Sequence, residues 1–163
     1  MKLHRLMSAA AVATLLALSI AAVPAAARER IIPATGTFTT TSFALTDPRP
    51  VQGGTLFKLD ATATVSGTLV GSSKILFGTC FFDLSGKATC AARELFTGSA
   101  VDEGGQTIGT GTLTFLERIN IDSITGASSG SAVSVGGTGG LKDVRAQLTF
   151  QNDQYSGRLI SGS

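Results

Sequence analysis

Two glutamates have the side chains and the spacing for acid–base chemistry. Side chains alternate between the two faces of a strand, so Glu94 shares a face with Phe96, and Glu117 shares a face with Phe115. If those faces point inward, both carboxyls enter an apolar interior, where their pKa values rise and they can transfer protons. Two simpler interpretations compete with this one. Each glutamate is solvated at the mouth of a barrel, or it pairs with Arg93, Arg118 or Arg145.

Two further polar side chains are candidates for contact with a ligand. Arg145 could bind a ligand carboxylate, or it could pair with Asp143 or Asp122 and close a rim. Tyr155, the only tyrosine, is either an ordinary strand aromatic or a residue that places its hydroxyl in a cavity. Nine phenylalanines and no tryptophan favour an interior that phenylalanine lines or fills. The ligand-binding candidates are therefore Glu94, Phe115, Glu117, Arg145 and Tyr155, and no catalytic residue is assigned.

The N-terminal segment has the three parts of an export signal. Lys2 and Arg5 give it a positive start, residues 6–23 are almost wholly apolar or small, and residues 25–27 are three alanines that suit a signal peptidase. We therefore expect residues 1–27 to be a signal peptide cleaved near Ala27, and the protein to be secreted or periplasmic. The alternative is a single transmembrane anchor, because about 18 residues of this kind can just span a bilayer.

Cleavage at Ala27 would change the chemistry open to the remaining chain. The only histidine, His4, lies in the removed segment, so no imidazole is left for a Ser-His-Asp or Cys-His site or for a histidine-type zinc site. The whole chain has 13 basic and 11 acidic residues, and without Lys2 and Arg5 these charges balance. A neutral chain without a basic run is a poor partner for nucleic acid or an anionic membrane. We expect no cofactor, no metal and no membrane span after cleavage.

The two cysteines are predicted to form a disulfide bond. Residues 83–87 have the composition of a turn, and Ser85 lies midway between Cys80 and Cys90. A hairpin centred on Ser85 makes the cysteines cross-strand partners, close enough to bond in an oxidising compartment. The alternative is a pair of buried thiols that pack as small apolar groups. A catalytic thiol is the least favoured interpretation, because no histidine would be available to lower its pKa.

Residues 28–163 are predicted to form one all-β domain with a single core. Apolar residues alternate with small or polar ones between turn residues, and no run has helical spacing. Pro48 and Pro50 are expected to end the first strand, and residues 125–130 to form a loop. Short connections favour sequential antiparallel pairing, and closure avoids exposed edges, so the expected fold is a closed eight-stranded antiparallel up-and-down barrel. The predicted strands cover residues 35–45, 55–65 (with 67–70 as a bent continuation), 74–82, 88–98, 107–121, 132–135, 144–150 and 155–160.

Three glycine-containing segments carry a resemblance to known proteins. They are residues 34–38 (Ala-Thr-Gly-Thr-Phe), 92–98 (Ala-Arg-Glu-Leu-Phe-Thr-Gly) and 136–145 (Gly-Gly-Thr-Gly-Gly-Leu-Lys-Asp-Val-Arg). Together they resemble a bacterial family of unknown function with an allene oxide cyclase-like barrel, over most of residues 34–160. The Gly-Thr-Gly-Gly-Leu part is also similar to plant dirigent proteins. Glu117 and Arg118 stand where a histidine is expected in the bacterial family, and Ala146 stands where a glycine usually follows the arginine.

The resemblance implies a barrel but no assigned activity. Enzymes on such barrels, among them allene oxide cyclases, dirigent proteins and some polyketide cyclases, hold a reactive apolar substrate in one shape, which needs no histidine. We expect a protein that binds a small apolar ligand in an open cavity of at least ~300 Å³, or a purely structural one. The alternative is a cofactor-free cyclase or isomerase with a cavity of the same kind. A further possibility is a homo-oligomer of the envelope or matrix, because dirigent-type barrels associate through their outer faces.

Overall fold

Eight β-strands and no helix make up the computed structural model, which describes residues 29–162. Inward side chains alternate with outward ones along each strand, with the two-residue period that the sequence predicts. Within the described range, no helix is long and apolar enough to cross a membrane. The predicted signal peptide, residues 1–27, lies outside the described residues. The strands are β1 (Arg30–Val51), β2 (Gly54–Gly67), β3 (Leu69–Asp83), β4 (Lys87–Val101), β5 (Thr107–Asp122), β6 (Ser128–Gly139), β7 (Val144–Gln151) and β8 (Gln154–Ser161).

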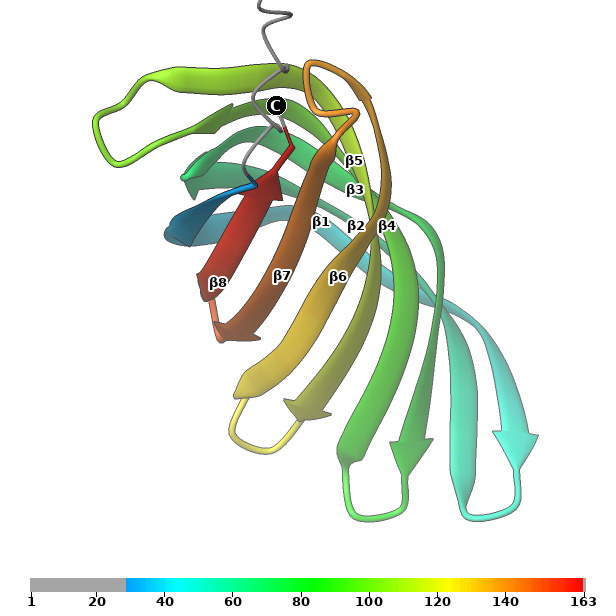
Figure 1. The fold of residues 1–163 in the computed structure, drawn as a ribbon. Helices are drawn as coiled ribbons and strands as arrows, with labels where there is room; N and C mark the ends of the chain where they lie inside the picture. Colours follow the sequence, from blue (N-terminus) through cyan, green and yellow to red (C-terminus); the bar gives the residue numbers. More distant parts are fainter. Residues whose placement is uncertain (1–28, 163) are drawn as a thin grey trace, which may run out of the picture.

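The strands form one antiparallel sheet that closes into a ring (Figure 1). Each strand pairs with the next along the chain, and β8 returns to pair with β1, where Arg30 lies opposite Ser161 and Thr37 lies opposite Gln154. The prediction of eight antiparallel strands in sequential order is confirmed. Closure pairs backbone groups of the first and last strands that an open sheet would leave exposed.

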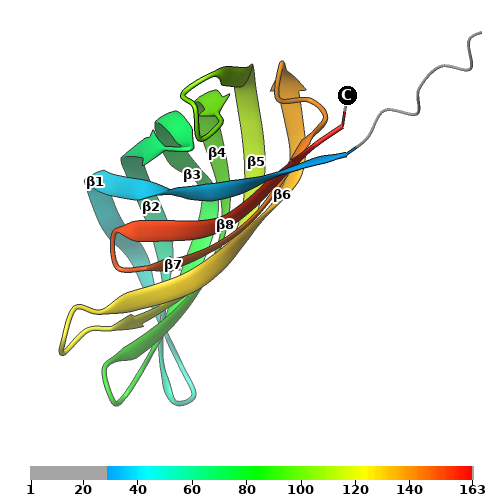
Figure 2. The same ribbon diagram turned by 60° about the vertical axis from the view of Figure 1, so that its left-hand side comes forward.

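The ring has two unlike ends (Figure 2). What we call the terminal end holds the start of β1 and the end of β8, and the hairpin end holds the β1–β2, β3–β4 and β5–β6 turns. Strands β7 and β8 have 8 residues each, whereas β1 has 22 and pairs with β8 only through residues 30–37. The three long hairpins therefore extend past β7 and β8, and β1 lacks a second neighbouring strand there.

Most of the core lies toward the terminal end. Phe96, Leu113 and Leu159 are at most 1% exposed, and the small side chains of Ala34 and Ala100 pack among them. A second, smaller cluster lies toward the hairpin end and consists of Leu59, Cys80, Cys90 and Ala92. The ring is thus filled at one end and only partly filled at the other.

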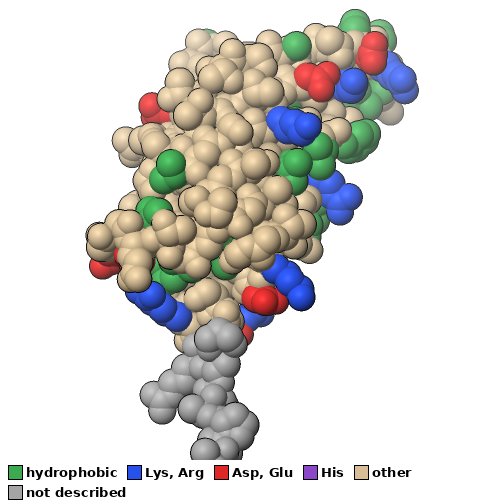
Figure 3. All heavy atoms as spheres, turned by 90° about the horizontal axis from the view of Figure 1, so that it is seen from above, with side chains coloured by type: hydrophobic (Ala, Val, Ile, Leu, Met, Phe, Trp, Pro, Cys, Tyr) green, Lys and Arg blue, Asp and Glu red, His purple; other side chains and the backbone are tan. Residues whose placement is uncertain are grey.

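Charged side chains are scattered over the outer surface. On the face shown in Figure 3, Lys and Arg side chains lie near Asp and Glu side chains, and neither sign forms a large patch. Lys58 and Asp60 form one exposed ion pair, with 3.5 Å between nitrogen and oxygen. No group of three potential metal ligands occurs in residues 29–162.

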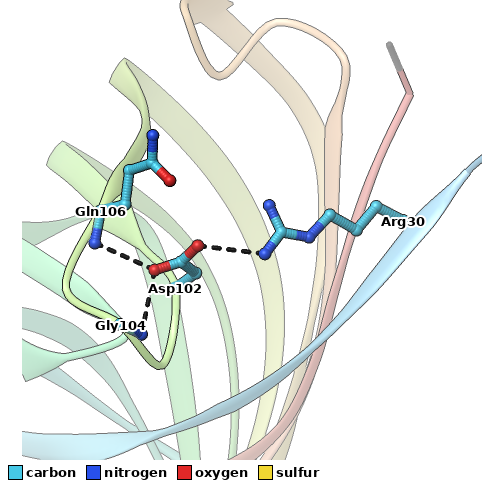
Figure 4. A network of polar contacts seen from close by, with 4 residues as sticks. All are labelled: Arg30, Asp102, Gly104 and Gln106. Atoms are coloured by element: carbon cyan, nitrogen blue, oxygen red, sulfur yellow. Dashed lines mark hydrogen bonds and ion pairs between the residues drawn. The ribbon is translucent and has the colours of Figure 1, made fainter.

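An aspartate ties β1 to the β4–β5 turn at the terminal end (Figure 4). The Asp102 carboxylate accepts hydrogen bonds from the backbone N–H groups of Gly104 and Gln106 at 3.0 and 2.9 Å, and from the Arg30 guanidinium at 3.0 Å. The Gln106 bond, followed by the Arg30 bond, lowers the pKa of Asp102 below its ordinary value. The turn predicted after residue 101 is confirmed, and its carboxylate also anchors the first strand.

The prediction that Pro48 and Pro50 end the first strand is wrong. Strand β1 continues to Val51, and the chain turns at residues 52–53. The β1–β2 register shifts between Thr46 and Arg49, so Pro48 lies in an irregularity where no regular ladder partner is needed. In this part of β1 only β2 is a neighbour, and such an edge strand tolerates the missing N–H of proline.

The assignment of residues 67–70 to the second strand is also wrong. The chain reverses at Thr68, so Leu69 begins β3. Gly67 makes this reversal possible, because its φ is 105° and an added Cβ would lie 2.3 Å from the Thr35 carbonyl oxygen. The loop predicted at residues 125–130 is shorter than expected, since β6 already begins at Ser128.

Candidate functional site: an interior cavity

The ring encloses a cavity of about 230 Å³ next to the packed terminal end. All eight strands contribute side chains to its walls, and most of these side chains are apolar. Phe96 and Phe115, 1% and 3% exposed, form part of its buried wall. Phe43 is 53% exposed and also lines the cavity, so the cavity reaches solvent beside this residue. The arrangement is a small apolar chamber with an entrance.

The volume limits the size of a ligand. The cavity of about 230 Å³ is below the ~300 Å³ that we expected for a ligand site, and below the range for drug-sized molecules. An apolar cavity of about 150 Å³ holds benzene. In proportion, this cavity has room for about nine or ten non-hydrogen atoms. The interior is therefore not completely packed, but it suits only a small molecule.

Glu94 and Glu117 meet inside this cavity. Glu94 of β4 lies opposite Phe115 of β5, and Ala92 lies opposite Glu117, so the two glutamates are diagonal neighbours on the inner face. Both line the cavity, and both are partly buried. Burial, together with the hydrogen bond and the charge of Glu94, raises the pKa of Glu117 to about 10. At neutral pH the Glu117 carboxyl therefore keeps a proton, which it donates to Glu94.

The three arginines that we considered as partners of the glutamates lie on the outer face of the sheet. Arg93, Arg118 and Arg145 are exposed and do not contribute to the cavity wall. Arg145 pairs with Glu29, and not with Asp143 or Asp122 as we had expected. The reason is the strand period, because the neighbours of Arg145 on both sides face the core and leave it facing outward. Arg145 is thus removed from the set of residues that can touch an interior ligand.

Tyr155 lines the cavity, but its hydroxyl forms hydrogen bonds with the backbone. The hydroxyl accepts a hydrogen bond from the Leu69 backbone N–H at 2.9 Å and donates one to the Ser66 carbonyl at 3.1 Å. These bonds join β8 to the β2–β3 turn, and burial raises the pKa of Tyr155. An added Cβ at Gly36 would lie 2.4 Å from the hydroxyl oxygen, so glycine makes room for this contact. Tyr155 offers its ring to the cavity, and its hydroxyl is already bonded.

Ser73 is a cavity residue that the sequence analysis did not single out. It is 7% exposed and is the one buried polar residue among residues 29–162. Ser73 lies opposite Phe96 while Ile75 lies opposite Glu94, so Ser73 is a diagonal neighbour of Glu94 on the cavity wall. A bulge between Ile75 and Phe77 changes which residues of β3 point inward. An alternation followed through the whole strand therefore could not identify Ser73.

The predicted disulfide bond is present. Cys80 and Cys90 are opposite residues of β3 and β4, and their sulfur atoms are 2.06 Å apart. In the turn between them, the Asp83 carboxylate accepts hydrogen bonds from the Ser85 N–H and hydroxyl and from the Lys87 N–H. These bonds, that of the Ser85 hydroxyl first, lower the pKa of Asp83. Both cysteines are fully buried, so the disulfide is a cross-link within the smaller core cluster.

Comparison with known proteins supports the fold and leaves the activity open. No protein-family model matches the chain. No curated protein matches it either. Among solved structures, it is similar to a protein of unknown function of the DUF3224 family from Shewanella oneidensis MR-1, with a TM-score of 0.58 and 17% sequence identity over 82% of this chain and 98% of that chain. The likeness agrees with the expected resemblance to bacterial proteins of unknown function, and at this identity it concerns the fold alone.

Proposed function

We propose that the protein is an exported binding protein, secreted or periplasmic, that holds one small apolar ligand inside an allene oxide cyclase-like barrel. The observation that carries the proposal is the apolar chamber of about 230 Å³, which the surrounding side chains leave unfilled. Protein interiors are normally close-packed, and an unfilled apolar space loses contacts between its walls. A ligand of matching shape would restore those contacts. The disulfide also agrees with an oxidising compartment.

A cavity-filling variant tests this proposal. Ala63 lines the chamber, so Ala63→Leu adds three carbon atoms to a space for about nine or ten. Ala91, exposed on the outer face of β4, provides the matched control Ala91→Leu. We expect propylbenzene to shift the NMR signals of cavity residues in the wild type and the control, and its affinity to fall at least tenfold in Ala63→Leu. Equal affinities in the two variants would contradict an interior site.

The natural ligand can be sought in the same protein. Native mass spectrometry of protein purified from its source, without denaturation, should show a mass increase that disappears on unfolding. Ala63→Leu expressed in the same source should lack the added mass, whereas Ala91→Leu should retain it. Absence of bound mass together with absence of propylbenzene binding would leave a purely structural role as the better account of the fold.

A second function is favoured by one specific observation, the proton-sharing carboxyls in the cavity. The Glu94 carboxylate could remove a proton from a carbon next to a ketone carbonyl, while Glu117 gives its proton to the carbonyl oxygen. The product is an enol, and the reverse steps return it to the ketone with a proton from Glu94 on the same carbon, so the net result is exchange of that proton. In D₂O, phenylacetone should then gain deuterium beside its carbonyl faster with wild type than with Glu94→Gln. Equal rates would exclude this chemistry for that ketone.

A further inference from the structure

A line of three polar side chains crosses the otherwise apolar wall of the cavity. Ser73 of β3, Glu94 of β4 and Glu117 of β5 follow one another as diagonal neighbours on the inner face. All three contribute to the cavity wall, opposite the apolar side chains of β1 and β8 such as Phe38. The line therefore gives the chamber one polar side. A ligand with one polar group would bind with that group toward this side.

The polar side carries a negative charge that no nearby cation balances. The cavity wall contains both glutamates but no Lys or Arg. Within residues 29–162, the ion pairs are Arg30–Asp102, Lys58–Asp60 and Arg145–Glu29, none of which involves either cavity glutamate. With one shared proton, the two carboxyls hold one net negative charge in an apolar setting. Such a charge is normally paired when it is buried.

Ser73 provides a second and independent sign that a polar ligand group belongs here. The residue is 7% exposed, and its hydroxyl forms no hydrogen bond within residues 29–162. Since no fully buried side-chain oxygen or nitrogen in this range lacks a partner, the Ser73 oxygen is itself accessible from the cavity. A hydroxyl that faces the open space of the cavity without a protein partner is free to bond a polar group of a ligand. Because Ser73 lines the cavity beside Glu94, a ligand group placed at Glu94 would also lie within its neighbourhood.

We propose that the ligand is a small apolar amine, bound as its ammonium ion, with the nitrogen at Ser73, Glu94 and Glu117 and the hydrocarbon part against the phenylalanine-rich wall. This inference rests on the proposed binding function and specifies the ligand class. An ammonium ion donates three hydrogen bonds, and the serine hydroxyl and the glutamate oxygens can accept them. Its charge cancels that of the pair, so the loaded cavity is neutral.

Charge distinguishes this ligand class from other small polar molecules. An alcohol or a ketone could also form a hydrogen bond with the glutamates, but it would leave the net charge in the cavity unbalanced. A carboxylic acid would add a second negative charge beside the first, which is strongly unfavourable at low dielectric. An amine is thus the one of these classes that satisfies both the hydrogen bonds and the charge.

Three probes of nine non-hydrogen atoms test the inference on the wild-type protein. They are 2-phenylethylamine, 2-phenylethanol and propylbenzene, which differ only in an ammonium, hydroxyl or methyl terminus at neutral pH. We expect the amine to bind at least tenfold more tightly than either neutral probe when measured by NMR titration at pH 7.5. If a neutral probe binds as tightly as the amine, the amine inference is overturned and the binding function stands. If none of the three binds, both are overturned.

Single substitutions then locate the ammonium group. Glu94→Gln removes the negative charge and should lower amine affinity at least tenfold, with little change for propylbenzene. Glu103, exposed in the β4–β5 turn, supplies the matched control Glu103→Gln, which should bind the amine like the wild type. Retained propylbenzene binding shows that Glu94→Gln is folded. Unchanged amine affinity in that folded variant would contradict the proposed position of the nitrogen.

Discussion

The terminal end and the hairpin end of the ring have the same strand alternation but bury their inward side chains differently. At the terminal end, β8 pairs with β1, and large side chains such as Phe96 and Leu113 fill the space between the strands. At the hairpin end, three hairpins extend past β7 and β8, and a disulfide links β3 to β4. The apolar chamber lies between the two ends. Strand length and ring closure, more than the alternation itself, therefore decide where the interior is filled.

The largest expected effect is at the packed end. Phe96→Ala should lower the free energy of unfolding by about 3–5 kcal/mol, because it removes a fully buried ring and leaves a cavity. Urea denaturation followed by circular dichroism would measure the change. A loss below about 1 kcal/mol would mean that the terminal end can collapse around the missing ring, contrary to a tightly packed core.

The disulfide should matter next, and mainly at the hairpin end. The double variant Cys80→Ala/Cys90→Ala should lose about 2–3 kcal/mol, since the short closed loop no longer restricts the unfolded chain. Hydrogen exchange should accelerate in the β3–β4 hairpin around Ser85 before it does so in the β1–β8 pairing. Equal acceleration at both ends would show that the two regions unfold as one unit.

Glu117 should make stability depend on pH. Its pKa is raised from 4.5 to about 10 in the folded protein, so the folded state holds a proton that the unfolded state releases between these values. Stability should therefore fall as pH rises through this window, by up to ~1.4 kcal/mol per pH unit. Glu117→Gln, whose amide can still donate to Glu94, should flatten the dependence of the melting temperature between pH 6 and 9.

A control separates this effect from general electrostatics. Glu103→Gln makes the same substitution at an exposed turn, where no buried proton is held, and should keep the slope of the wild type. The aspartates in the turns, Asp83, Asp102 and Asp122, have lowered pKa values and titrate below this pH range. An unchanged slope in Glu117→Gln would therefore show that the buried pair does not hold the extra proton.

The smallest effect on stability is expected at the cavity entrance. Phe43 is 53% exposed, so Phe43→Ala should cost less than about 1 kcal/mol. The substitution should instead widen the entrance and speed the release of propylbenzene, which NMR exchange spectroscopy can measure. A loss as large as that of Phe96→Ala would remove the distinction between a packed and an open end.

Part of this structure could be predicted from local pattern, and the rest depended on contacts distant in sequence. Alternation identified most of the strands and placed Glu117 on the same face as Phe115, and the midpoint at Ser85 predicted the disulfide. The end of the first strand was predicted wrongly because an edge strand tolerates Pro48 and Pro50. Whether a strand lies at an edge is not visible in a sequence. The start of the third strand was also predicted wrongly, because the reversal after Gly67 depends on a contact distant in sequence. Gly67 lets the Thr35 carbonyl of β1 approach closely.

The sequence by itself determined the all-β class, the number and order of strands, the cross-strand position of the two cysteines, and that each glutamate shares a face with a phenylalanine. These follow from the two-residue period and from hairpins between neighbours. Only the tertiary structure decided that Arg145 faces outward to Glu29, that a bulge turns Ser73 inward, and that Glu94 and Glu117 share a cavity without a cation. Ring closure and bulges set the register between strands. Register, not composition, determines which charges meet in the interior.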